Sequence, residues 1–115
     1  MKNRIYFIAF TSCLISLISA CAKPTEACFD FSPSVSISPI TTVTFDASCT
    51  KNGGTSYKWN FGDGTVDTTV MGDPIVTHTF NTTGTFTVRL EARRKDGVVL
   101  FENNKYITER TVVVQ

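Results

Sequence analysis

Side chains alternate between apolar and polar in three stretches of the sequence, and this alternation limits the possible folds more than any other feature. Apolar residues occupy every second position of residues 43–47, 57–61 and 86–92. Because successive side chains of a β-strand point to opposite faces of a sheet, each stretch predicts a strand with one buried and one solvated face. Strands of this kind form two antiparallel sheets packed against each other. The expected inward-facing residues are Val43, Phe45, Ala47, Tyr57, Trp59, Phe61, Phe86, Val88, Leu90 and Ala92.

Two further groups of residues extend this pattern. Val76, His78 and Phe80 stand at alternate positions and predict a fourth inward-facing set, and Val112 and Val114 predict a last strand. Gly, Pro, Asn and Asp interrupt the chain about every ten residues, as they do in β-sandwiches. With no helical periodicity after the first 21 residues, we predict an all-β antiparallel sandwich.

The N-terminal residues have a different character. Lys2 and Arg4 precede an uncharged apolar run over residues 5–20, which is shorter than the roughly 20 residues of a membrane-spanning helix. The run ends in Ile18-Ser19-Ala20-Cys21, which resembles the lipobox of bacterial lipoproteins. This resemblance implies cleavage before Cys21 and acylation of its thiol with fatty acids such as palmitate. An ordinary signal peptide cleaved nearby is the alternative interpretation.

The lipobox resemblance implies a division of the chain and a location. We expect a signal peptide at residues 1–20, a lipidated tether at 21–27 and a domain at 28–115. The expected location is the bacterial cell envelope, anchored to a membrane through Cys21. Ala22 is compatible with delivery to the outer membrane under the sorting rule of enteric bacteria. Loss of the signal would change the formal net charge from +1 to −1, and this near-neutrality argues against a nucleic-acid partner.

Two of the four cysteines are available for a disulfide. Cys13 lies in the signal and Cys21 is assigned to the lipid, which leaves Cys28 and Cys49 in an oxidising compartment. If residues 38–41 form the turn between the first two strands, Cys28 and Cys49 stand at nearly opposite positions of the hairpin. We therefore predict a Cys28–Cys49 disulfide.

Three separate blocks of sequence resemble the PKD domain family. They are Trp59-Asn60-Phe61-Gly62-Asp63-Gly64, His78-Thr79-Phe80, and Gly84-Thr85-Phe86-Thr87-Val88-Arg89-Leu90. The resemblance implies an immunoglobulin-like sandwich of about seven strands, a fold of many secreted and surface proteins. It also implies a structural role for the signature residues, which are Trp59, Phe61, Gly62, Asp63, Gly64, His78, Phe80 and Gly84. Residues 98–106 make the last hairpin longer than is usual in the family.

Catalysis and metal binding have little support in the sequence. His78 is the only histidine, and its inward position between apolar residues favours a structural, hydrogen-bonded role over a catalytic one. No nucleophile–base pair can be assembled, so we expect no enzyme activity. Asp63, Asp67 and Asp73 could offer oxygens to calcium, but their spacing matches no calcium-binding loop. We expect neither a metal nor another cofactor.

The predicted role is a non-catalytic one of contact with protein or glycan partners, or of spacing. Phe101 and Tyr106 are the aromatic residues whose direction the pattern leaves open, so they are possible contact residues. The alternative is an accessory carbohydrate-binding subunit of a polysaccharide-degrading enzyme system. We also expect basic loop residues to gather where the chain enters the domain and to face the membrane, although they could be merely solvated loops. They are Lys23, Lys51, Arg93, Arg94, Lys95 and Lys105.

Overall fold

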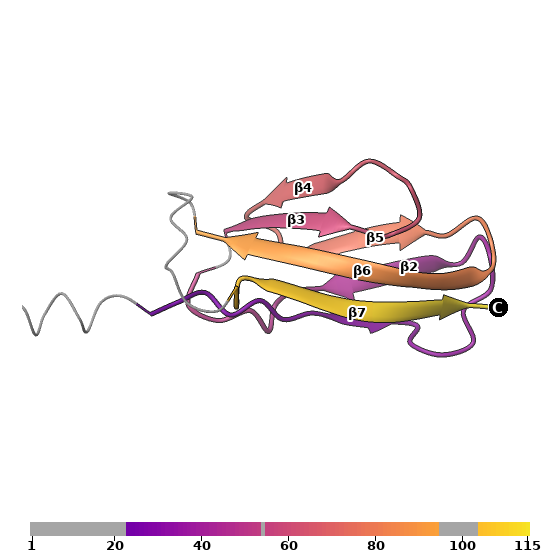
Figure 1. Cartoon of the computed structure of the whole chain (residues 1–115), viewed down its shortest axis with the longest axis horizontal. Helices are drawn as coiled ribbons and strands as arrows, with labels where there is room; N and C mark the ends of the chain where they lie inside the picture. Colours follow the sequence, from indigo (N-terminus) through magenta and orange to yellow (C-terminus); the bar gives the residue numbers. More distant parts are fainter. Residues whose placement is uncertain (1–22, 54, 95–103) are drawn as a thin grey trace, which may run out of the picture.

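The computed structural model describes residues 23–53, 55–94 and 104–115 and shows two antiparallel sheets packed face to face (Figure 1). The strands are β1 (Asp30–Ser32), β2 (Thr42–Asp46), β3 (Ser56–Asn60), β4 (Thr68–Met71), β5 (Ile75–Thr79), β6 (Gly84–Arg93) and β7 (Ile107–Val114). One sheet has the order β1-β2-β5 and the other β4-β3-β6-β7. The predicted all-β sandwich is therefore confirmed. Among the described residues, no helix is long and apolar enough to cross a membrane.

The predicted alternation of buried and exposed side chains is also confirmed. Trp59 is fully buried and lies at the centre of the core, where Phe29, Phe45 and Phe61 surround it with ring centroids 5.1, 5.8 and 6.3 Å away. The inward-facing residues of β2, β3 and β6 are buried, with Phe86 partly so, and Val112 and Val114 of β7 complete the core. Val76 and His78 are partly buried, because they lie on the edge strand β5.

The first two strands are antiparallel neighbours, as expected, but the turn at residues 38–41 does not join them directly, and this part of the prediction is wrong. β1 pairs with β2 over only three residues, with Phe31 opposite Phe45. The chain then crosses to the other sheet, where Ile37 forms a parallel bridge to Val114. Pro33 follows β1 directly and has no N–H with which to extend the ladder. The apolar Ile37 side chain is instead buried against the second sheet, and the turn at residues 38–41 follows this crossing.

The predicted disulfide is present despite that error. Cys28 and Cys49 are bonded, with their Cα atoms 5.3 Å apart. They lie just beyond the end of the β1–β2 ladder, where Asp30 faces Asp46. Continuing this register would place Cys28 opposite Ser48, so Cys49 is one residue out of register, and the disulfide still forms.

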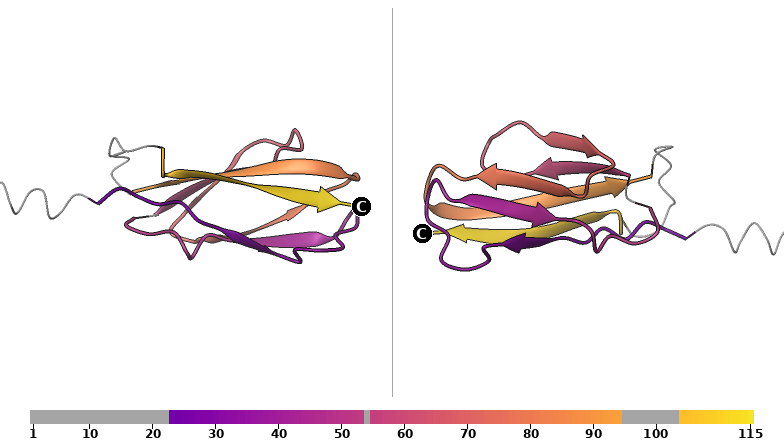
Figure 2. Two further views of the ribbon diagram at one scale, coloured as in Figure 1. Left: turned by 60° about the horizontal axis from the view of Figure 1, so that its bottom comes forward. Right: turned by 180° about the vertical axis from the view of Figure 1, so that it is seen from behind.

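The molecule has two distinct ends (Figures 1 and 2). The first described residues, from Lys23, lie at the end at which β6 finishes and β7 starts, and Gln115 lies at the opposite end. We call the first the proximal end and the second the distal end. The proximal end comprises residues 23–28, 46–53, 55, 72–74, 93–94 and 104–106, and the distal end comprises residues 33–41, 61–67, 80–83 and 115.

Residues 24–27, which the sequence assigns to the tether, are hydrogen-bonded to the proximal loops. Glu26 and Lys51 exchange two backbone hydrogen bonds of 3.0 Å, and the Ala27 amide donates to the Lys105 carbonyl at 2.8 Å. The Thr25 hydroxyl donates to the Asn52 carbonyl at 3.0 Å, and the Asn52 side chain donates back to the Pro24 carbonyl at 3.3 Å. The described chain is therefore held on the domain from Pro24 onwards.

Candidate functional site

The Gly-Asp-Gly sequence after β3 forms the expected turn, and its two glycines are needed for different reasons. Gly62 and Gly64 both have positive φ values, of 71° and 84°. A Cβ atom on Gly62 would lie 2.4 Å from the backbone oxygen of Thr87, whereas one on Gly64 would meet no atom within 4 Å. Gly62 therefore permits close approach of the turn to β6, and Gly64 supplies only the backbone conformation.

Asp63, at the centre of this turn, is bonded to two neighbours. Its Oδ1 accepts hydrogen bonds from the hydroxyl and the amide of Thr65, at 2.6 and 3.2 Å. Its Oδ2 lies 2.6 Å from Nε2 of His78 on β5. Partial burial by itself favours the protonated acid, but the hydrogen bonds from Thr65 and His78 outweigh it and lower the pKa of Asp63.

The sequence did not reveal the Asp63–His78 pair, because the two residues come from a loop and a strand that meet only in the folded chain. The His78 ring stacks on Phe61 with centroids 3.9 Å apart, and the Phe80 ring stands edge-on at 4.8 Å. Within the described residues, the hydrogen bond of this imidazole goes to a carboxylate and not to a hydroxyl or thiol. The pair thus fastens the turn to β5.

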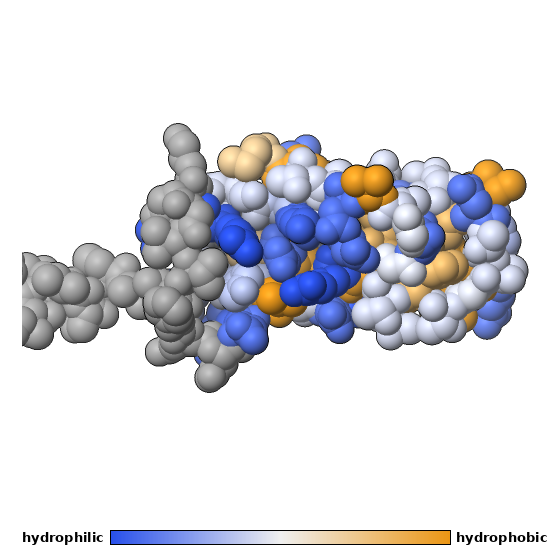
Figure 3. Space-filling view, turned by 45° about the horizontal axis from the view of Figure 1, so that its top comes forward, coloured by the Kyte–Doolittle hydropathy of each residue, from blue (hydrophilic) through white to orange (hydrophobic). Residues whose placement is uncertain are grey.

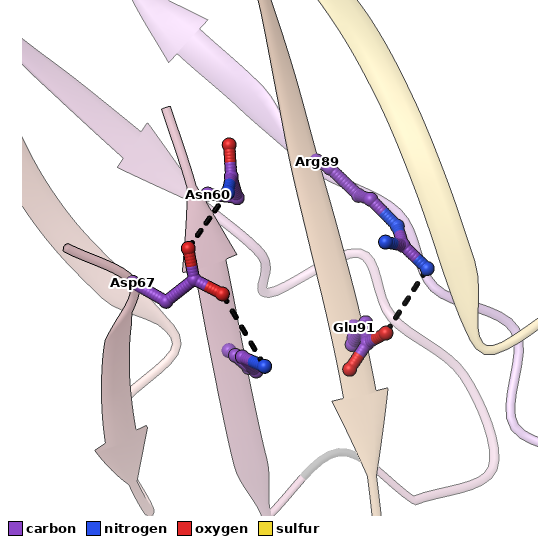
Figure 4. A pocket seen from close by; sticks show the side chains of 5 residues that line it. Asn60, Asp67, Arg89 and Glu91 are labelled. Atoms are coloured by element: carbon purple, nitrogen blue, oxygen red, sulfur yellow. Dashed lines mark hydrogen bonds and ion pairs between the residues drawn. The ribbon is translucent and has the colours of Figure 1, made fainter. Parts of the chain in front are cut away.

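A shallow polar hollow lies on the outer face of the four-stranded sheet (Figure 4). Its volume is about 40 Å³, and its lining residues are Lys58, Asn60, Asp67, Arg89 and Glu91. The strand register explains the grouping, because Lys58 faces Glu91 and Asn60 faces Arg89 across the β3–β6 pair. The alternation in the sequence placed four of these residues on a solvated face, but it did not indicate a hollow.

Each carboxylate of the hollow is matched by a donor. Asp67 accepts a 2.7 Å hydrogen bond from the Asn60 amide and lies 3.3 Å from the Lys58 ammonium. Glu91 accepts a 3.1 Å hydrogen bond from Arg89. The hollow therefore offers several donors and acceptors with little net charge, and no aromatic ring lines it. This chemistry suits hydroxyl-rich or amide-bearing ligands better than ions.

The remaining predicted residues fall in different places. Phe101, like Cys21, lies outside the described residues. Tyr106 is partly buried, and the Arg93 guanidinium lies 5.5 Å from its ring centroid, so it is a less open contact residue than expected. Asp73 accepts a hydrogen bond from the Ile75 amide and takes no part in the networks of Asp63 and Asp67. In the described part of the chain, no group of three or more His, Cys, Asp or Glu side chains could hold a metal ion.

The distal end exposes apolar side chains that the sequence reasoning overlooked. Val35, Ile40 and Val66 are 76%, 76% and 89% exposed. Ile40 also has a φ of 69°, which a β-branched residue rarely adopts. Figure 3 shows strongly hydrophilic side chains gathered toward the proximal end, whereas the surface toward the distal end is paler, with scattered apolar side chains.

Comparison with known proteins agrees with this architecture. The PKD domain family matches residues 28–100. A solved structure described as a carbohydrate-binding module of the β-sandwich superfamily is 27% identical, with a TM-score of 0.66 over 80% of this chain and 34% of that one. The chain thus spans about a third of that structure. The PKD1 domain of Vibrio anguillarum Epp is 21% identical, with a TM-score of 0.57 over 81% of this chain and 95% of that one.

No curated protein is similar enough in sequence to serve as a relative. The family match nevertheless covers more than half of the chain and contains all three blocks of the signature. The two sheets, the buried Trp59 and the Gly-Asp-Gly turn are arranged as that signature implies. The chain therefore belongs to the PKD domain family.

Proposed function

We propose that this protein is a non-catalytic lipoprotein of the bacterial cell envelope, with an acylated Cys21 and a PKD domain that contacts a partner away from the membrane. The proposal rests on one observation: the end at which the chain enters the domain and the end with exposed apolar side chains lie on opposite sides of the molecule. The chain enters the domain at the proximal end, and Ile40 is exposed at the distal end. An anchor at Cys21 leaves the distal end free for a protein or glycan partner.

Ile40 is the strongest candidate for contact at that end. A left-handed conformation costs an L-residue roughly 1–2 kcal/mol. An exposed apolar side chain gains nothing from burial in the free domain that would offset this cost. Its amide is bonded to the Phe80 carbonyl at 2.8 Å, so the strained residue has a fixed position. A fixed, exposed apolar residue is typical of a contact surface.

Mass spectrometry of the protein isolated from bacterial membranes tests the anchor. The mature N-terminus should be Cys21, with the added mass of a diacylglyceryl group, and Cys21→Ser should release the protein into the soluble fraction. An unmodified N-terminus at another residue would overturn the lipoprotein assignment.

Affinity capture from envelope extracts tests the contact end. Immobilised wild-type protein should retain a partner that Ile40→Asn loses. Val113→Thr is the matched control, because Val113 is an exposed apolar residue on a regular strand. Equal retention by all three proteins would exclude the Ile40 contact.

A second candidate function is carbohydrate binding within a polysaccharide-degrading system. The similarity to a carbohydrate-binding module and the hydrogen-bonding groups of the hollow favour it. In this case the protein should be retained on insoluble polysaccharide. Asn60→Ala combined with Arg89→Ala should abolish retention, while Ile40→Asn should leave it unchanged. The reverse pattern would favour a contact at the distal end.

A further inference from the structure

Positive charge is distributed unevenly between the two ends. At the proximal end, the described basic residues are Lys23, Lys51, Arg93, Arg94 and Lys105, and the acidic ones are Glu26, Asp46 and Asp73. At the distal end, no described residue is Lys or Arg, and Asp63 and Asp67 are acidic. Lys95, Asp96 and Glu102 lie outside the described residues. The described ends thus differ in the sign of their formal charge.

The chain before the domain is short. Because Pro24 is already hydrogen-bonded to Asn52, only Ala22 and Lys23 lie between a lipid anchor at Cys21 and the domain. The three residue steps from Cys21 to Pro24 reach only about 10 Å even when fully extended. This reach is close to the Debye length of roughly 8–10 Å at physiological ionic strength. An anchored proximal end therefore stays within the range at which its charges respond to a charged surface.

We propose that the proximal end docks against an anionic lipid surface and that the domain stands with its distal end away from the membrane. This orientation rests on the proposed anchor at Cys21. Anionic headgroups attract nearby Lys and Arg side chains, and the attraction falls off within a Debye length. A surface that attracts the proximal end also repels the acidic distal end, so both effects favour the same orientation.

The ion pairs of Lys105 and Arg93 are weak enough for these side chains to turn to lipid headgroups. Lys105 lies 3.9 Å from Glu26, with both side chains nearly half exposed. Arg93 lies 3.7 Å from Glu91. Exposed ion pairs at such distances contribute little, so phosphate groups can replace them at small cost. Lys23 and Lys51 are exposed as well.

Glu26, Asp46 and Asp73 limit the strength of the attraction. The Ser48 hydroxyl and amide donate hydrogen bonds to Asp46 and lower its pKa, which keeps this carboxylate charged. The described charges of the proximal end leave only a small positive excess. We therefore expect an oriented anchored domain, and no adhesion of the domain to vesicles without its anchor.

A chemically anchored protein tests the docking independently of biological acylation. Every described strand and core residue lies after residue 22, so the chain 21–115 retains the described fold. Cys21 is its single thiol, because Cys28 and Cys49 are bonded. Coupling Cys21 to a maleimide lipid fixes the chain to vesicles. A fluorophore is attached through a genetically encoded azide, either at Thr55 on the proximal end or at Thr82 on the distal end. A quencher confined to the bilayer then reduces the fluorescence of whichever end lies close to the membrane.

On phosphatidylglycerol vesicles, quenching at Thr55 should exceed quenching at Thr82 several-fold, since β6 alone places about 30 Å between the ends. The difference should shrink on phosphatidylcholine vesicles, and at about 1 M salt, where the Debye length is near 3 Å. Equal quenching at both positions on anionic vesicles, or stronger quenching at Thr82, would overturn the docking. Absence of acylation in cells would overturn only the proposed anchor.

Charge reversal supplies the matched control. Lys51→Glu combined with Lys105→Glu should remove the difference between Thr55 and Thr82. Lys58→Glu, on the outer sheet face, should leave the difference in place although the Lys58 side chain is as exposed as that of Lys105, at 49% and 45%. Circular dichroism establishes that each variant is folded. Equal effects of the two reversals would show that net charge, and not the proximal end, sets the orientation.

Discussion

The two ends of the sandwich are held together in different ways. At the proximal end, the Cys28–Cys49 disulfide closes the structure covalently, and backbone hydrogen bonds hold Glu26 against Lys51. At the distal end, the turn around Asp63 is fastened to β5 by a hydrogen bond to His78 and by the Phe61–His78 ring stack. The stability of the proximal end therefore depends on the redox state of two cysteines, and that of the distal end on the ionised carboxylate of Asp63.

Removal of the disulfide should produce the largest loss of stability. The cysteines are 21 residues apart, and in the chain-entropy model a loop of this length contributes about 3 kcal/mol. Cys28→Ser combined with Cys49→Ser should lower the free energy of unfolding by that amount in denaturant titrations. Hydrogen exchange should accelerate at Glu26 and Lys51 more than at the distal turn. Uniform acceleration would show that the ends are not held separately.

His78→Gln should have the next largest effect and should loosen the distal end. The substitution removes the partly buried hydrogen bond to Asp63 and the ring stack on Phe61. Their loss should lower the free energy of unfolding by about 1–2 kcal/mol. Thr77→Gln, at the neighbouring exposed position of β5, is the control and should cost little. A His78→Gln protein with an unchanged melting temperature that loses partner binding would show that the histidine acts in binding.

Ile40→Asn should stabilise the distal end by about 1 kcal/mol, because asparagine tolerates the left-handed conformation better than isoleucine. Val66→Asn is the control, since Val66 is also exposed but lacks a positive φ. Thermal unfolding measures both variants. A destabilised Ile40→Asn protein would mean that the isoleucine side chain contributes contacts that outweigh the backbone strain.

Acid should loosen the distal end through Asp63. Since the pKa of Asp63 is lowered below its ordinary value of 3.8, the unfolded chain binds this proton at a higher pH than the folded chain does. The stabilisation by the ionised Asp63 is therefore complete above the pKa of the unfolded chain. It is lost as the pH falls through the lower pKa that Asp63 has in the folded chain. Asp63→Asn should therefore flatten the acid side of the stability profile. Asp46→Asn, which removes a carboxylate whose side-chain hydrogen bonds come from Ser48 alone, should flatten it less.

Lys58→Ala should have the smallest effect, although it removes an ion pair with Asp67. Both side chains are at least one-third exposed, and such pairs contribute at most about 0.5–1 kcal/mol. If Lys58→Ala shifts the unfolding midpoint more than Ile40→Asn does, the side chains that line the hollow contribute to the stability of the fold. Unchanged stability would leave the hollow as a surface available to ligands.

The sequence predicted those features that depend on neighbouring residues. Alternation over Tyr57, Trp59 and Phe61 is local, so it indicated a strand and its buried face directly. The disulfide followed from assigning the other cysteines. The path after β1 was missed because it depends on Ile37 meeting Val114, which is far along the chain.

The site was harder to predict than the fold for the same reason. Asp63 and His78 each have a complete local explanation in the sequence, and nothing in their spacing indicates that the turn folds over β5. The hollow draws residues from two strands and the loop that follows β3, and it arises from the sheet register rather than from a motif. Ile40 is identified by its backbone conformation, which composition does not reveal.

The position of the disulfide has a mechanical consequence. A force that pulls the N-terminal segment away from the distal end reaches Cys28 before it reaches β1. The load can then pass through the covalent bond to Cys49 and into β2, instead of acting on a strand that is paired over only three residues. With this bond intact, rupture requires shearing of longer strands. With the bond reduced, the same force acts on the three-residue β1–β2 ladder alone, so reduction should change the route of mechanical unfolding.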